Sequence, residues 1–305
     1  MNSSQQQHSD PVTGTTVPGN RLRMPAWLKR PIAYIGHKKT IESVLRDGLL
    51  HTVCVEAKCP NRGECFSKGT ATFLILGDTC SRSCRFCNVN KGKPSPVDLG
   101  EPERLCDAAE KMNLRHIVVT SVTRDDLSDG GAKQFVRVVH ALRARMPNRS
   151  IELLIPDFNG NGAALEAVFD SRPDILNHNI ETVPRLYGAI RPQAQYERSL
   201  AVLKAASSGS IPLIAKSGLM VGLGETFDEV TATLKNLADA GCSIVTIGQY
   251  LQPSQQQVPV YEFVKSEQFK EYEDVGAALG LQVFSGTFVR SSYRALEVFD
   301  RHDCC

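Results

Sequence analysis

TFLILGDTCSRSCRFCNV, residues 72–89, joins a short apolar run to a loop that holds three cysteines within eight positions. These cysteines, called the second triad below, are Cys80, Cys84 and Cys87. Their C-x3-C-x2-C spacing matches neither the four-cysteine ferredoxin run nor the paired C-x2-C pattern of a zinc site. A loop of this length can wrap one face of an iron–sulfur cube, which leaves the fourth iron open to a small molecule. The stretch therefore predicts a strand followed by a reactive cluster.

The same kind of apolar run recurs along the chain. Six β-rich runs occur, at residues 72–77, 116–121, 150–155, 174–180, 211–218 and 243–249. Stretches with helical spacing lie between them, at 102–113, 130–146, 160–170, 195–208 and 226–241. Continuous apolar runs are typical of parallel strands covered on both faces. This alternation of predicted strands and helices indicates an α/β fold, a partial (β/α)6 TIM-like barrel. A doubly wound open sheet is the alternative. In either fold, the active site lies at the carboxyl ends of the strands.

Composition limits the class of function. The chain has 305 residues, a hydrophobic content of 42% and a formal net charge of only +2. A charge this close to zero does not favour a nucleic acid or an acidic membrane surface as a partner. No apolar stretch is long enough to span a bilayer, and MNSSQQQHSD at the start lacks the apolar segment of a secretory signal. We therefore expect a cytoplasmic protein with no nucleic-acid or membrane partner.

Six of the ten cysteines fall between residues 54 and 87. A disulfide framework belongs to small secreted domains, so in this chain crowded thiols more often indicate a metal site. The first triad, Cys54, Cys59 and Cys65, lies in CVEAKCPNRGEC, residues 54–65. Because His51 stands close by, a Cys3His zinc site is an alternative to an iron–sulfur cluster here.

The two triads carry a family resemblance. The second triad, with Phe86 in the aromatic place, is similar to the signature of the radical S-adenosylmethionine (SAM) enzymes. The first triad followed by the second resembles the lipoyl synthases. The likeness extends over roughly residues 25–300 and includes TSVTRDDLSDGGA (120–132), HNIETV (178–183), KSGLMVGLGET (216–226), TIGQYLQPS (246–254) and VRSSYRA (289–295).

The resemblance implies two [4Fe-4S] clusters and SAM as cofactors. The second triad would hold the cluster whose open iron binds SAM and whose electron cleaves it to a 5′-deoxyadenosyl radical. The first triad would hold an auxiliary cluster with Ser292 as its fourth ligand, and this cluster would be the source of two sulfur atoms inserted at C6 and C8 of a protein-bound octanoyl group. Ser292 is therefore both a metal ligand and a catalytic residue in this interpretation. An alkoxide is a harder ligand than a thiolate, so the iron it holds could leave first.

The resemblance also implies a SAM pocket at the carboxyl ends of the strands. Its expected residues are Phe86, Thr120, Asn179, Glu181, Arg191, Gly222, Gly224 and Glu225. Each of three segments also has a structural alternative. NHNIE could provide a buried polar pair, AIRPQ an exposed arginine at a helix end, and GLGET a simple β–α turn. The aspartates of TRDDLSDGG are expected to shape the loop, with Asp129 or Ser128 capping the next helix. Cys106 and Cys242 are expected in the core.

We expect four regions along the chain. They are a disordered tail at 1–22, an N-terminal extension with the first triad at 23–71, the barrel at 72–285 and a C-terminal extension with the RSSY motif at 286–305. Trp27 is expected to anchor an extended arm on the barrel. The basic segments LRMPAWLKRP and HKK (37–39) form either a docking face for an acidic carrier or a solvated basic face.

The resemblance implies two kinds of protein partner. One is an octanoylated lipoyl carrier protein or domain, such as the glycine cleavage H protein or the E2 component of a 2-oxoacid dehydrogenase. The other is an electron donor such as ferredoxin or flavodoxin. Three other functions compete with this interpretation: another radical sulfurtransferase related to the methylthiotransferases or biotin synthase, a two-cluster electron-transfer protein, and a zinc-stabilised binding module.

Overall fold

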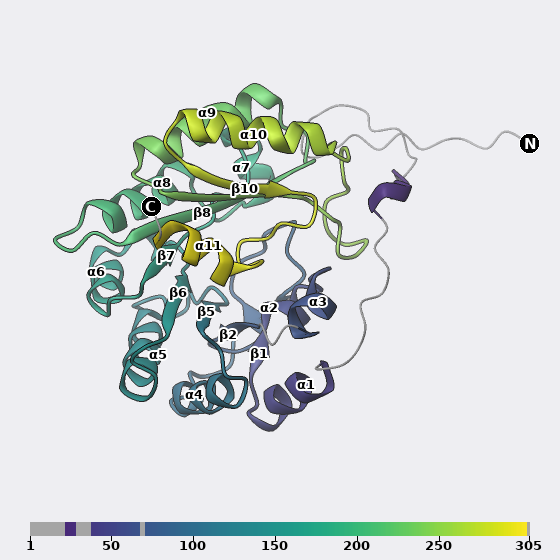
Figure 1. Ribbon diagram of the computed structural model, residues 1–305. Helices are drawn as coiled ribbons and strands as arrows, with labels where there is room; N and C mark the ends of the chain where they lie inside the picture. Colours follow the sequence, from purple (N-terminus) through teal and green to yellow (C-terminus); the bar gives the residue numbers. More distant parts are fainter. Residues whose placement is uncertain (1–21, 29–37, 68–70, 304–305) are drawn as a thin grey trace, which may run out of the picture.

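The computed structural model describes residues 22–28, 38–67 and 71–303 (Figure 1). In this part of the chain the main sheet has eight strands in the order β1-β2-β5-β6-β7-β8-β9-β10. Its strands are β1 His51–Thr52, β2 Thr72–Ile75, β5 His116–Ser121, β6 Ser150–Leu154, β7 Ile175–Asn177, β8 Ile214–Val221, β9 Ile244–Gln249 and β10 Gln282–Gly286. Two short strands, β3 Thr79–Cys80 and β4 Asn90–Lys91, pair within the loop of the second triad.

The strand order separates the two predicted topologies. From β2 to β10 every neighbouring pair is parallel and follows chain order, whereas a doubly wound sheet reverses direction at a switch point. The partial TIM-like barrel is therefore confirmed. The main sheet has two strands that the sequence did not predict: β10, parallel to β9, and β1, antiparallel to β2.

Helices surround the outer face of the sheet (Figure 1). The helical segments are η1 Ala26–Leu28, α1 Lys38–Asp47, α2 Val53–Glu56, α3 Arg62–Ser67, α4 Glu101–Lys111, α5 Ala132–Arg145, η2 Phe158–Gly160, α6 Gly162–Asp170, α7 Pro184–Ile190, α8 Tyr196–Ser208, α9 Phe227–Asp239, α10 Ser266–Ala278 and α11 Ala295–Asp303. All five helices predicted between the strands are present, whereas α2, α3, α7, α10 and α11 were not predicted. No helix in the described residues is both long and apolar enough to cross a membrane.

Two groups of buried side chains form the core between sheet and helices. One joins β2, β5 and β6 to α4, α5 and α6, and the other joins β8 and β9 to α7, α9 and α10. Cys106 (0% exposed) belongs to the first group and Cys242 (7% exposed) to the second, so both are core residues as predicted.

Local capping explains where two helices begin. Thr226 caps α9, and its hydroxyl accepts from the Glu229 amide while the Glu229 carboxylate accepts from the Thr226 amide. This reciprocal pair satisfies amides that the helix itself leaves without partners. Before α5, the Asp129 carboxylate accepts from the amides of Gly131 and Lys133. Asp129 thus binds two amides at the start of α5, although Gly131 and not Asp129 occupies the N-cap position.

The N-terminal arm differs from expectation in its anchor. Trp27 is 53% exposed, whereas its neighbour Leu28 is 2% exposed. The prediction that Trp27 anchors the arm is wrong, because the smaller aliphatic side chain takes the buried position. The tail up to residue 21 and residues 29–37, which include Lys29, Arg30 and His37 of the basic segments, lie outside the described residues.

The segment between β10 and α11, residues 287–293, is called the strap below. Figure 1 shows it in yellow, passing in front of the sheet toward the N-terminal helices α2 and α3. The Asn61 amide donates to the Phe288 carbonyl at 2.6 Å, and the Tyr293 hydroxyl donates to the Glu64 carboxylate at 3.0 Å. The strap thus connects the C-terminal extension to the segment that carries the first triad.

Candidate functional site

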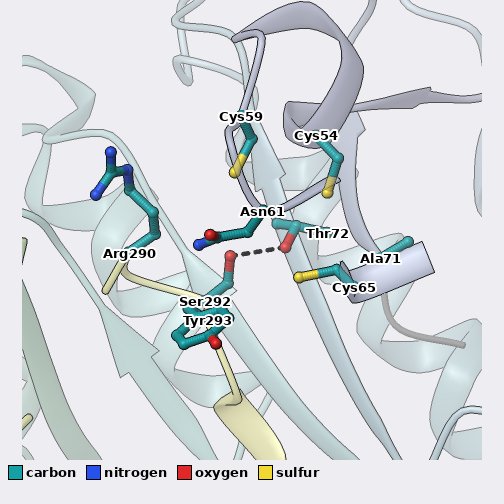
Figure 2. Close-up of a pocket in the computed structure, with 9 residues that line it drawn as sticks. All are labelled: Cys54, Cys59, Asn61, Cys65, Ala71, Thr72, Arg290, Ser292 and Tyr293. Carbon is teal, nitrogen blue, oxygen red and sulfur yellow. Dashed lines mark hydrogen bonds between the residues drawn. The ribbon is translucent and has the colours of Figure 1, made fainter. Parts of the chain in front are cut away.

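The first triad and Ser292 line one cavity, although they come from opposite ends of the chain. Cys54 lies on α2, Cys59 follows that helix, Cys65 lies on α3, and Ser292 comes from the strap. The cavity contains about 280 Å³ of empty space, part of it open to solvent. Figure 2 shows the three thiols and the Ser292 hydroxyl arranged around the same space. Three thiols and one hydroxyl form a four-ligand donor set, which fits a cluster held by all four.

One contact favours metal binding in this cavity, and burial of one thiol opposes it. The Thr72 hydroxyl donates to the Ser292 oxygen at 2.7 Å (Figure 2), and such a donor stabilises an oxygen that carries negative charge. Burial raises the pKa of the Cys54 thiol to about 11, so this group is protonated at neutral pH until a metal displaces the proton.

The zinc alternative requires His51 at the first triad. His51 instead lies within 3.2 Å of the Glu56 carboxylate and does not line the cavity. Among the described residues no three His, Cys, Asp or Glu side chains gather closely enough to hold a single metal ion. None of the eight described cysteines is in a disulfide.

The second triad lies in the loop directly after β2. The Cys80 sulfur accepts from the backbone amides of Thr123, at 3.3 Å, and Arg82, at 3.5 Å. Burial raises the pKa of the Cys84 thiol, and it raises the pKa of the Cys87 thiol to about 12. Three thiols on one short loop at the carboxyl end of a strand are what the sequence predicted for the reactive cluster.

A buried arginine clamps this loop to its neighbours. The Arg82 guanidinium donates to the Asp125 carboxylate at 2.7 and 2.9 Å and to Asp157 at 2.7 Å. Although burial opposes ionisation, Arg82 lowers the pKa of Asp157 to about 2. Arg198 completes the group through a second ion pair with Asp157, at 2.7 Å. Asp125 thus shapes the loop, as predicted, while Arg82 and Asp157 were not predicted from the sequence.

A cationic and an anionic side chain stand close to Cys84. Arg191 is buried and donates from Nη1 to the Asn179 carbonyl at 2.9 Å and to the Tyr187 hydroxyl at 2.7 Å. Its buried Nε has no partner among the described residues. Glu181 adopts a left-handed backbone, φ 68°, and accepts from the Asn179 amide at 3.1 Å. Burial raises the pKa of Glu181, and Arg191 opposes this effect.

This pair fits the amino-acid end of a ligand such as SAM. An arginine with a donor to spare matches a carboxylate, and a carboxylate beside it matches an ammonium group. The structure therefore brings Asn179, Glu181 and Arg191 together next to the second triad. The alternative of an exposed helix-end arginine does not hold, because Arg191 is only 9% exposed.

The other residues expected at the SAM pocket have partners within the protein. Phe86 packs against the core group formed with α7, α9 and α10. The Thr120 hydroxyl donates to the Leu154 carbonyl at 2.7 Å. The next residue, Ser121, has a buried hydroxyl with no partner among the described residues. Ser121 is therefore the better donor for a ligand at this strand end.

The GLGET segment is explained by its own turn. Gly222 has φ 94°, and a methyl group there would overlap the Gln249 amide, so the backbone requires glycine. The Glu225 carboxylate accepts from the amides of Gly222 and Leu223, and burial raises its pKa to about 7. Gly224, with φ 105°, presents its carbonyl to Arg185 at 2.7 Å. These contacts hold the turn that starts α9, beside the strand end where a ligand would lie.

The interior of the barrel holds polar groups that the sequence analysis missed. The Lys216 ammonium donates to both Glu152 carboxylate oxygens at 2.9 Å, and both side chains are fully buried. His116 lies within 3.3 Å of the same carboxylate. The signal was present, since Glu152 and Lys216 interrupt apolar runs of predicted parallel strands.

Comparisons with known proteins give a matching family and close relatives in sequence for this chain. Residues 74–248 match the Radical SAM superfamily. The chain is 52% identical over 278 residues to a lipoyl synthase of Caldicellulosiruptor saccharolyticus, covering 91% of this chain and 98% of the relative. It is 50% identical over 281 residues to a lipoyl synthase of Chlorobium phaeovibrioides, with 92% and 99% covered. Among solved structures, Streptococcus suis SuiB bound to S-adenosylmethionine has a TM-score of 0.55 at 10% identity, covering 82% of this chain and 61% of SuiB; this likeness concerns the fold alone.

Proposed function

The chain belongs to the lipoyl synthase family of radical SAM enzymes, and from this we propose that its two cysteine triads hold two [4Fe-4S] clusters with separate tasks. The activity is that of a radical SAM sulfurtransferase, which inserts two sulfur atoms at C6 and C8 of an octanoyl group bound to a lipoyl carrier. When bound, SAM and the two clusters supply the electron, the hydrogen-abstracting radical and the sulfur atoms. The observation that carries the proposal is the cavity shared by Cys54, Cys59, Cys65 and Ser292.

In the proposed auxiliary site, both extensions of the chain contribute ligands. Residues 23–71 provide the first triad, and residues 286–305 provide Ser292. Thr72, the first residue of β2, donates to the Ser292 oxygen and so favours its deprotonated, metal-binding form. The barrel at 72–285 provides the wall between them. Neither extension supplies the four-ligand set alone, which is why we treat the extensions as parts of one site.

In the proposed SAM site, the second triad leaves one iron for the ligand. Arg191 would bind the SAM carboxylate through its Nε, and Glu181 would accept from the SAM ammonium group. Asn179 orients Glu181 through its amide, and Ser121 offers a hydroxyl at the end of β5. Phe86, Thr120 and the turn of Gly222, Gly224 and Glu225 would form the surrounding wall.

The partners proposed for the reaction follow from the family resemblance. The carrier would be the glycine cleavage H protein or the E2 component of a 2-oxoacid dehydrogenase, and the electron donor ferredoxin or flavodoxin. We place the protein in the cytoplasm, since crowded thiols persist in a reducing compartment and the described cysteines are not in disulfides.

Alanine substitution of each triad tests the division of tasks. In air-free protein we expect about eight irons per chain, from two cubes of the four-iron type. Replacing the second triad should abolish SAM cleavage. Replacing the first triad should leave cleavage largely intact, stop sulfur insertion and halve the iron content. The Cys242→Ala variant is the matched control, because this thiol is buried in the core outside both triads.

Two results would contradict the proposal. Zinc without inorganic sulfide in the purified protein would exclude iron–sulfur clusters at the triads. Equal loss of SAM cleavage in both triad variants, with Cys242→Ala unaffected, would show that the tasks are not divided as proposed.

A further inference from the structure

Ser291, the residue before the proposed cluster ligand, is held by two asparagines of the barrel. The Asn177 amide donates to the Ser291 hydroxyl at 2.8 Å, and that hydroxyl donates to the Asn179 side-chain oxygen at 2.8 Å. Ser291 therefore acts as acceptor and donor at once. Asn177 ends β7, so the strap is fixed to a strand end more than a hundred residues away in the sequence.

The two asparagines are themselves fixed. The Asn177 amide also donates to the Glu152 carboxylate at 2.8 Å, and Glu152 is bound by Lys216 and lies close to His116. This carboxylate sets the orientation of the asparagine, because the flipped amide would place an oxygen against it. On the other side, Asn179 donates to Glu181. A continuous hydrogen-bonded chain thus runs from the buried ion pair through Ser291 to the proposed SAM site.

The barrel leaves room for the strap at a glycine. Gly248, in β9, lies against the Val289 backbone, and a methyl group at this position would overlap the Val289 carbonyl oxygen. At the far side of the strap, Asn61 donates to the Phe288 carbonyl. After Ser291, the Tyr293 hydroxyl donates to Glu64. The strap is therefore held on both sides of Ser291, and the Ser291 side chain fixes it in between.

We propose that Ser291 is a positioning residue for the auxiliary cluster. Its hydrogen bonds to Asn177 and Asn179 fix the position of the neighbouring Ser292 oxygen. The proposal rests on the assignment of Ser292 as the fourth ligand. Ser291 itself does not line the cavity, whereas Ser292 does. Serine is a weak ligand for a cluster, and the iron that it binds can be lost. The retention of this iron therefore depends on how well the serine oxygen is held in place.

The retention of iron at the auxiliary site tests this role. All variants are made in a parent whose second triad is replaced by alanine, so that the auxiliary cluster is the only one present. The measurement is the rate at which a chelator removes the first iron, together with the Mössbauer spectrum of the cluster. Ser291→Ala should release this iron about tenfold faster than the parent, since two hydrogen bonds to the strap are lost. Ser291→Thr keeps the hydroxyl and should remain within about twofold.

Two controls separate this inference from the proposed function. Ser207→Ala removes a hydroxyl that also makes two hydrogen bonds, but at the end of α8, and should leave the release rate unchanged. Ser292→Ala should change both the rate and the spectrum. If Ser292→Ala had no effect, the proposed ligand would be wrong. If Ser292→Ala had its effect but Ser291→Ala matched the parent, the positioning role alone would be wrong.

Hydrogen exchange of the cluster-free protein provides a second measurement that needs no metal. The amides of residues 288–293 should exchange about tenfold faster in Ser291→Ala than in the parent, while Ser291→Thr should restore protection. Unchanged protection in Ser291→Ala would also overturn the proposal.

Discussion

The Lys216→Met substitution gives the strongest test of the barrel interior. Lys216 and Glu152 are both fully buried, and two contacts of 2.9 Å join them. Methionine has a similar length but no charge, so it leaves the Glu152 carboxylate with the His116 ring and the Asn177 amide as its partners. Breaking a buried ion pair on one side typically lowers the free energy of unfolding by about 3–5 kcal/mol.

The pKa of Glu152 gives the pH dependence of this stabilisation. Burial raises this pKa, but Lys216 and His116 lower it to about 2 from the ordinary value of 4.5. The ionised carboxylate is therefore the form that stabilises the folded protein. Because the folded-state pKa is below the unfolded value, this stabilisation is present above pH 4.5 and is lost as the pH falls toward 2. In Lys216→Met the carboxyl takes up its proton at higher pH, so the difference from the wild type should narrow on acidification.

Urea unfolding of the cluster-free protein at pH 8 and at pH 4 provides the assay. The matched control is Lys270→Met, because Lys270 is 67% exposed and pairs with Asp274 at 2.9 Å on the surface of α10. Removing this exposed pair should leave the free energy of unfolding nearly unchanged. The double substitution Glu152→Gln with Lys216→Met should be more stable than Lys216→Met alone. Equal effects of Lys216→Met and Lys270→Met would refute the reasoning.

Three further substitutions test other parts of the two sites. Arg191→Lys should weaken SAM binding about tenfold or more in equilibrium dialysis, because lysine has no Nε–H fork to share between Asn179 and a carboxylate; unchanged affinity would contradict the proposed pocket. Glu225 has its pKa raised to about 7, so the folded state retains a proton that the unfolded state has lost, and the free energy of unfolding should fall as the pH rises from 5 to 7. Glu225→Gln should reduce the change in the free energy of unfolding between pH 5 and pH 7. An unchanged pH dependence in this variant would mean that other groups cause it. Gly248→Ala should displace the strap and reduce sulfur insertion about tenfold while SAM cleavage persists, since the new methyl group overlaps the Val289 carbonyl; equal loss of both activities would indicate general misfolding.

The predicted strands depended on continuous apolar runs and the predicted helices on helical spacing, and both patterns were reliable here. Three elements in the C-terminal part were missed: α10, β10 and α11. Every residue of β10 is only half-buried, so QVFSG lacks the continuous apolar character of the other parallel strands. In η1 the pattern misled, because the large ring of Trp27 suggested an anchor and the neighbouring Leu28 is the buried residue.

The site was predictable to a different degree for each kind of residue. Thiols repeated at short spacing identify a metal site without further information, so both triads were visible in the sequence. Arg82 and Ser291 were not, because their partners stand 43 and 112 positions away and no local pattern marks them. Ser292 was predicted from the family resemblance alone, and a bare RSSY segment would equally suit a surface turn.

The polar interior of the barrel has a consequence for the substrate. An octanoyl chain that reaches between the two proposed clusters is apolar, and burying it against unpaired charges would be costly. Glu152 is already neutralised by Lys216, and the Asn177 amide already donates to Glu152 and Ser291. The charges of the network are therefore paired, although the Asn177 side-chain oxygen has no partner among the described residues. Because Asn179 contacts both Ser291 and Glu181, the same network links the strap to the residues of the proposed SAM site.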